Sequence, residues 1–161
     1  MSFLNKVKKK LKNGSWYPFY NSFYENNSLD PRMILLESRS GGALESNILS
    51  LLKELSREPY KNFNLILSVR KNAESEIKEK LRKNSIQGVS FVHTGSVSYY
   101  RALSRAGYLV NDSSFPGRFV KKEGQIYLNT WHGTPLKKMG RDNRPEMVTM
   151  GNVLRNLLDS D

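Results

Sequence analysis

One short segment of the sequence holds side chains that can bind phosphate and move a proton. It runs from Trp131 to Asp142 and reads Trp-His-Gly-Thr-Pro-Leu-Lys-Lys-Met-Gly-Arg-Asp. His132 titrates near neutral pH, so it can take a proton from an attacking hydroxyl group. Gly133 lets the backbone approach a ligand closely. Thr134 adds a hydroxyl group, and Pro135 adds a stiff turn. Three positive charges that can bind a phosphate come from Lys137, Lys138 and Arg141.

These residue types at this spacing predict a phosphate-handling loop with His132 as a candidate general base. A second interpretation is that His132 only completes a hydrogen bond of the loop, beside lysines that are simply solvated. The sequence has no cysteine, which excludes a disulfide framework, a zinc–thiolate site and a thiol nucleophile. We expect neither a metal nor a cofactor.

The elements that must position this loop alternate between strand and helix. Short apolar runs predict five strands, at residues 33–37, 64–69, 89–93, 108–111 and 125–130. Helical spacing of apolar residues predicts helices at 44–55, 73–83 and 97–106, the last of these ending at Gly107, and at about 147–158. Buried strands separated by helices indicate a parallel sheet covered on both faces. We therefore expect an α/β fold, a Rossmann-like parallel sheet of about five strands with helices on both faces.

Functional groups in such folds gather at the carboxyl ends of the strands. The His132 segment follows the fifth predicted strand. Polar stretches follow the other four strands, at residues 38–42, 70–72, 93–96 and 111–117. Gly41 and Gly42 are too weak a signal for a phosphate-binding glycine loop, and we expect His93 to be structural.

The charge of the chain points to an anionic partner. The 161 residues include 26 lysines and arginines against 15 acids, a net charge of +11. No apolar run approaches the ~20 residues that span a bilayer. Nucleic acid, a lipid surface and a phosphorylated substrate all fit such a charge.

Much of this charge lies in residues 1–24, which contain no acid. A short amphipathic helix is predicted there, followed by an aromatic cluster in which Pro18 should break any continuous helix. The pattern suits an anionic membrane surface, and the expected contacts are Lys6, Lys8, Lys9, Lys10, Lys12 and Trp16. Alternatively, the aromatic residues pack on the domain, or the lysines bind nucleic acid. We expect no nucleic-acid partner, because the basic and aromatic residues gather at one terminus.

The string from Tyr127 to Gly140 resembles the signature of the CDP-glycerol:poly(glycerophosphate) glycerophosphotransferase family, the teichoic acid primases and polymerases. The resemblance spans roughly residues 33–158. It includes Leu36-Glu37-Ser38 and Asn111-Asp112-Ser113-Ser114-Phe115-Pro116 upstream, and Met150-Gly151-Asn152 downstream.

The resemblance implies a two-domain, GT-B-like enzyme that is peripheral to the cytoplasmic face of the cell membrane. Such an enzyme transfers glycerol phosphate, or ribitol phosphate in close relatives, from a CDP-alditol to a lipid-linked polymer. His132 is the implied general base on the acceptor hydroxyl, and CMP leaves. No nucleophile on the protein is involved.

Family members carry a second essential histidine and the donor site in a later half. We therefore expect residues 25–161 to form a Rossmann-like acceptor-side domain without the C-terminal nucleotide-binding domain, and residues 1–24 to form a membrane-surface segment. The chain should bind a lipid-linked glycerol-phosphate acceptor, meet a CDP-alditol only with the other half supplied, and be inactive alone. The alternative is a non-enzymatic module that binds membrane or polyanions.

Overall fold

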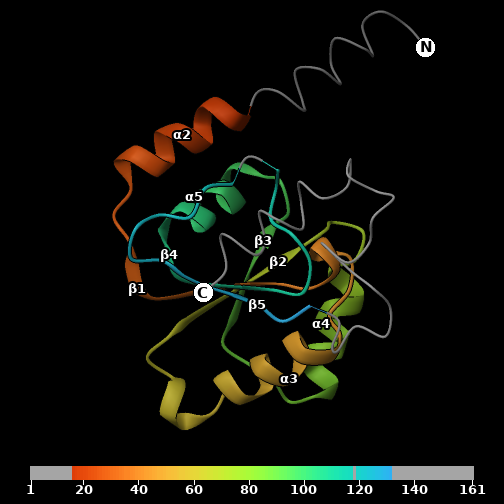
Figure 1. The fold of residues 1–161 in the computed structure, drawn as a ribbon. Coiled ribbons are helices and arrows are strands. Elements are labelled where there is room, and N and C mark those ends of the chain that lie inside the picture. The colour runs from red at the N-terminus through yellow and green to blue at the C-terminus, as the bar shows by residue number, and fades with distance from the viewer. Residues whose placement is uncertain (1–15, 118, 132–161) are drawn as a thin grey trace, which may run out of the picture.

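The five expected strands form one parallel sheet. The computed structural model describes residues 16–117 and 119–131. The strands are β1 (Asp30–Glu37), β2 (Asn64–Val69), β3 (Val89–His93), β4 (Ala106–Asn111) and β5 (Ile126–Asn129). Every pairing is parallel, and the order across the sheet is β3-β2-β1-β4-β5 (Figure 1). The order of the chain reverses between β1 and β4, which is the switch point where α/β sheets bind ligands.

Helices cover both faces of this sheet, which confirms the α/β prediction. They are α2 (Trp16–Asn26), α3 (Ser46–Leu55), α4 (Glu74–Lys83) and α5 (Val97–Arg105), with short 3₁₀ turns η1 (Arg39–Gly41) and η2 (Glu58–Tyr60). α3 and α4 lie on one face, and α2 and α5 on the other (Figure 1). Successive strand residues point to opposite faces of the sheet. Ile34 and Leu36 therefore pack in the core under α3 and α4, and Leu35 packs in the core under α2 and α5.

The predicted boundaries differ from the structure at Gly107. We expected this glycine to end the third helix, but α5 already ends at Arg105 and Gly107 lies inside β4. A Cβ atom at Gly107 would lie 2.9 Å from the Asp30 carbonyl oxygen. Glycine is therefore required by the close approach of β4 to β1, and not by a helix end. The helix expected at 147–158 lies outside the described residues.

A second correction concerns Pro18, which does not break the aromatic segment. α2 runs without interruption from Trp16, so Pro18 is its third residue. Proline is tolerated there because the first four backbone N–H groups of a helix have no partner within it.

Part of the aromatic segment belongs to the core. Tyr20 is 3% exposed, and its hydroxyl donates to the carbonyl of Val120 at 3.0 Å. Tyr24 packs against the same core. The boundary expected between residues 24 and 25 thus falls inside α2, while the five lysines of residues 6–12 lie outside the described residues. None of the described helices has the length and apolar character needed to cross a bilayer.

Candidate functional site

The switch point brings three polar loops together at the carboxyl edge of the sheet. Glu37 of β1 pairs in register with Asn111 of β4, and Asn111 pairs with Asn129 of β5. The next residues of these strands therefore leave the sheet side by side, about 4.8 Å apart between neighbouring strands. One of these exits leads directly into the His132 segment.

Asp112 ties the loop after β4 to the loop after β1. Its carboxylate is 3% exposed and accepts hydrogen bonds from the Ser38 hydroxyl and from the Arg39 backbone N–H, each at 2.8 Å. The Ser38 oxygen in turn accepts from the Glu45 backbone N–H at 3.3 Å. A buried carboxylate is stable only when its oxygens are satisfied in this way. Asp112 thereby fixes the loop after β1 across the switch point.

That loop holds a turn of unusual handedness. Arg39, Ser40 and Gly41 have φ angles of 50°, 51° and 76°, which places three consecutive residues in the left-handed region. Such a conformation costs about 1 kcal/mol or more for each residue other than glycine. It persists because bonds from outside the turn hold it: Arg70 donates its Nε to the Ser40 carbonyl at 3.0 Å and its backbone N–H to the Gly41 carbonyl at 2.7 Å. Strain of this kind, held by surrounding contacts, is typical of functional sites.

Glu37 forms the buried floor beneath the turn. Its side chain is 1% exposed, and it accepts a hydrogen bond from the Ser68 hydroxyl at 2.8 Å. Burial raises the pKa of Glu37 to about 7, with a smaller contribution from the charge of Asp112, while the hydroxyls of Ser68 and Tyr99 and the charge of Arg70 oppose the rise. The carboxyl is therefore close to half protonated at neutral pH.

Tyr99 lies in the same buried environment. Its hydroxyl is close enough to influence Glu37, but it meets no partner with hydrogen-bond geometry. Burial, followed by the charge of Glu37, raises the pKa of Tyr99 well above its ordinary value. Tyr99 therefore stays a neutral phenol throughout the physiological range.

Hydrogen bonds fix the position of the two residues between β5 and His132. Thr130 donates its backbone N–H to the Asn111 carbonyl at 2.8 Å, and Trp131 donates its own to the Asn129 side chain at 3.0 Å. Asn129 also donates to the Ser113 carbonyl at 2.9 Å. Trp131 has φ of 48°, so a residue in the left-handed region stands directly before His132.

The predicted site residues themselves all follow Trp131. His132, Gly133, Thr134, Pro135, Lys137, Lys138 and Arg141 lie outside the described residues, and their roles stay predictions. Trp16 begins α2, and its membrane contact also stays a prediction. Among the described residues no group of three or more His, Asp or Glu side chains is placed to hold a metal ion.

His93 has a structural partner, as the sequence suggested. Its Nε2 atom lies 2.7 Å from a carboxylate oxygen of Glu74, at the first turn of α4. Hydrogen bonds from Lys78 and His93 lower the pKa of Glu74. This partly exposed pair joins the end of β3 to α4.

The sequence did not predict two features of the site, which are the Asp112 clamp and the buried Glu37. Both are acids directly at or after the end of an apolar strand, at positions 37 and 112. An acid at that position of a parallel strand reaches the carboxyl edge of the sheet, so the signal was present. Their neighbours in space could not be read from it, because they come from strands far apart in the chain.

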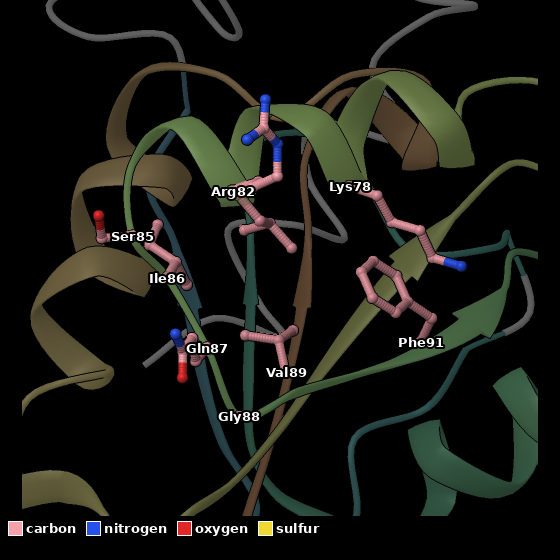
Figure 2. A pocket seen from close by; sticks show the side chains of 9 residues that line it. Lys78, Arg82, Ser85, Ile86, Gln87, Gly88, Val89 and Phe91 are labelled. Atoms are coloured by element: carbon pink, nitrogen blue, oxygen red, sulfur yellow. The ribbon is translucent and has the colours of Figure 1, made fainter.

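A hollow on the molecule lies away from this edge. It has a volume of about 360 Å³ and is lined by α4, by the loop before β3 and by the first residues of β3 (Figure 2). Lys78 lies over the ring of Phe91, 5.4 Å from its centre, and Arg82 pairs with Glu79 at 2.8 Å. Since Gly88 directly precedes strand β3 and Val89 begins it, the hollow belongs to the amino edge of the sheet.

Comparison with known proteins places the chain in a known family. Residues 19–161 match the family CDP-Glycerol:Poly(glycerophosphate) glycerophosphotransferase. The teichoic acid poly(glycerol phosphate) polymerase of Staphylococcus epidermidis is 31% identical over 139 residues, which cover 84% of this chain and 17% of that protein. The polymerase of the same description from Bacillus subtilis strain 168 is 29% identical over 144 residues, 86% of this chain and 18% of that protein.

A solved structure shows the same fold. The structure of the wall teichoic acid polymerase TagF aligns with a TM-score of 0.68 and 27% identity, over 95% of this chain and 36% of that chain. The 161 residues thus span less than a fifth of the two curated relatives and about a third of the solved chain.

Proposed function

This chain belongs to the CDP-glycerol:poly(glycerophosphate) glycerophosphotransferase family, and we propose that it supplies the acceptor side of an enzyme that builds teichoic acid or a related cell-surface polymer. In this proposal the enzyme transfers alditol phosphate from CDP-glycerol or CDP-ribitol to a lipid-linked acceptor. The observation that carries the proposal is the position of Trp131, the residue directly before His132. Trp131 follows β5 at the carboxyl edge of a Rossmann-like sheet, the edge where such folds bind substrates.

The proposed chemistry needs one base and no nucleophile on the protein. His132 takes the proton of the acceptor hydroxyl, and the resulting oxygen attacks the phosphorus that carries the alditol. A bond forms between the acceptor oxygen and that phosphorus. The bond from the same phosphorus to the bridging oxygen breaks, and CMP leaves with the electron pair. Lys137, Lys138 and Arg141 would balance the phosphate charge.

The described residues support this chemistry by fixing where the segment starts. Asn111, Asn129 and Ser113 hold the last turn before His132 through three hydrogen bonds. A base must be held close to its proton in a fixed orientation, because misplacement by about 1 Å can cost a hundredfold in rate. The strained Trp131 backbone is consistent with such a role.

A transfer assay tests the proposal with a matched pair of histidines. This chain would replace the corresponding segment of the Bacillus subtilis polymerase, with radiolabelled CDP-glycerol and a lipid-linked primer as substrates. We expect His132→Asn to reduce transfer at least a hundredfold through loss of the base, and His93→Gln to leave most of it. Unchanged transfer by the His132 variant would refute the assignment of the base.

The 161 residues by themselves should not turn over these substrates. They correspond to about a third of the solved polymerase chain, and we assign them to the acceptor only. Robust transfer by the isolated chain under the same conditions would contradict that assignment.

A further inference from the structure

Arg70 stands at the carboxyl edge of the sheet, and part of its guanidinium has no partner among the described residues. It directly follows β2, and its side chain is exposed. Its Nε atom donates to the Ser40 carbonyl at 3.0 Å. Its two Nη groups donate to no described residue, and no described carboxylate forms an ion pair with it. By contrast, Arg39 beside it pairs with Glu45 at 3.3 Å.

The left-handed turn is what holds Arg70 in this orientation. Because Ser40 has a φ angle of 51°, its carbonyl lies where the Arg70 Nε can reach it. The next residue, Gly41, packs so tightly that a Cβ atom there would lie 2.1 Å from the Thr94 hydroxyl. Asp112 secures the other end of the turn through the Arg39 N–H. The strained turn thus fixes one edge of the Arg70 guanidinium.

We propose that Arg70, oriented by the Arg39–Gly41 turn, binds a phosphodiester of the acceptor polymer at a position away from the reacting end. This inference rests on the proposed function for the identity of the polymer. A guanidinium presents paired N–H donors that match two phosphate oxygens, which a lysine ammonium cannot do. An arginine held by its Nε, with no described residue bonded to either Nη group, has the geometry for that contact.

The position of Arg70 determines which phosphate it meets. β2 and β5 are separated by β1 and β4, so Arg70 lies roughly 14 Å across the sheet from the point where the chain enters the His132 segment. A phosphate bound there belongs to an earlier repeat of the polymer than the terminal hydroxyl. Arg70 should therefore favour acceptors that carry several phosphates over a single glycerol phosphate.

Binding of synthetic glycerol-phosphate oligomers, measured by calorimetry on the 161-residue chain, tests the inference. We expect Arg70→Gln to weaken binding of an oligomer of several repeats about tenfold or more, which is the range for charged hydrogen bonds. Arg70→Lys keeps the charge but loses the fork and should be intermediate. Glycerol 3-phosphate should bind more weakly to the wild type and respond less to the substitution.

Arg82→Gln is the matched control. Arg82 is an exposed arginine in the last turn of α4, at the amino edge of the sheet, and an exposed pair such as that with Glu79 contributes little to stability. Equal weakening by the Gln variants at positions 70 and 82 would mean that only net charge matters, and it would overturn the inference while leaving the proposed function intact.

Inorganic phosphate separates the two claims further. We expect it to shift the nuclear magnetic resonance signal of the Arg70 Nε–H in the wild type. If phosphate shifts that signal but the oligomer fails to bind, the anion site stands and the proposed function fails. If neither ligand acts on Arg70, the inference is wrong.

Discussion

At the scale of single residues, two buried carboxyl groups determine the shape and the electrostatics of the candidate site. Asp112 uses both oxygens to fix the loop after β1. Glu37 has one hydroxyl donor, from Ser68, and is shielded from water. Burial raises the pKa of Glu37 to about 7.

Glu37 should make the protein less stable as the pH rises toward neutrality. Its pKa in the folded state is about 7 against an ordinary value of 4.5, so the folded state holds this proton more tightly than the unfolded chain does. Below about pH 4.5 both states are protonated and the group has no cost. Above about pH 7 both states have lost the proton, and the folded state carries a buried charge that costs about 3 kcal/mol of unfolding free energy.

Glu37→Gln should remove that dependence. Chemical denaturation at pH 5 and pH 8 should show the unfolding free energy of the wild type falling relative to that of the variant by about 2–3 kcal/mol. Glu25→Gln, at an exposed position of α2, controls for the substitution itself. Parallel pH profiles for the wild type and the Glu37 variant would contradict the assignment.

At the scale of elements, the sequence predicted the strands and helices well because their signals are local. Runs of apolar residues such as 64–69 and 89–93 coincide with β2 and β3. The turn at Arg39–Gly41 could not be predicted in the same way. Its left-handed backbone is held by Asp112, 73 residues away, and by Arg70, 30 residues away. No local pattern specifies such contacts.

The same reasoning accounts for the errors at Pro18 and Gly107. Both residues are helix breakers by local propensity, but neither ends a helix here, because of where each lies in the fold. Pro18 falls in the first turn of α2, where its missing N–H is not needed. Gly107 lies where β4 approaches the β1 backbone. The sequence predicted that the His132 segment follows the fifth strand. The order of the strands at the switch point, by contrast, came only from the structure.

Two glycines with the same φ angle test how tightly the turn is packed. Gly41 and Gly95 both have φ of +76°, but a Cβ atom at Gly41 would lie 2.1 Å from the Thr94 hydroxyl, whereas one at Gly95 would have nothing within 4 Å. Gly95→Ala should cost about 1 kcal/mol of unfolding free energy, from backbone strain alone. Gly41→Ala should cost about 2 kcal/mol more, from overpacking against Thr94 and the Arg70 backbone.

Thermal and chemical denaturation of both variants supply the comparison. Equal destabilisation would show that the turn tolerates a side chain, and the account of how Arg70 is oriented would then lose its support.

At the scale of the whole molecule, the lysine-rich start of the chain lies outside the part that matches the family. The family match begins at residue 19, inside α2. α2 is part of the packed domain through Tyr20. The lysines at positions 6–12 precede both, so we propose that an attachment to a membrane relies on residues 1–15, with Trp16 directly after them, and not on the whole aromatic segment.

Liposome co-sedimentation tests this placement. Replacing Lys6, Lys8, Lys9, Lys10 and Lys12 by Gln should weaken binding to anionic vesicles at least about a hundredfold, since each lysine near such a surface contributes about 1 kcal/mol. The control replaces the same number of exposed basic residues elsewhere in the described domain, Lys53, Lys61, Lys78, Arg82 and Lys83. A truncation should remove residues 1–15 only, because removing 1–24 would also take Tyr20 from the core.

If both charge variants bind vesicles equally, or if binding survives removal of residues 1–15, the membrane assignment is wrong.

We propose that these residues form the acceptor side of a glycerophosphotransferase. The isotope-labelled chain can be titrated separately with a glycerol-phosphate oligomer and with CDP-glycerol while the backbone amide signals are recorded. We expect the oligomer to shift the signals of residues 38–42, 111–114 and 129–131, at the carboxyl edge of β1, β4 and β5, and CDP-glycerol to shift them little. Tight binding of CDP-glycerol to those loops, with no response to the oligomer, would refute the acceptor role.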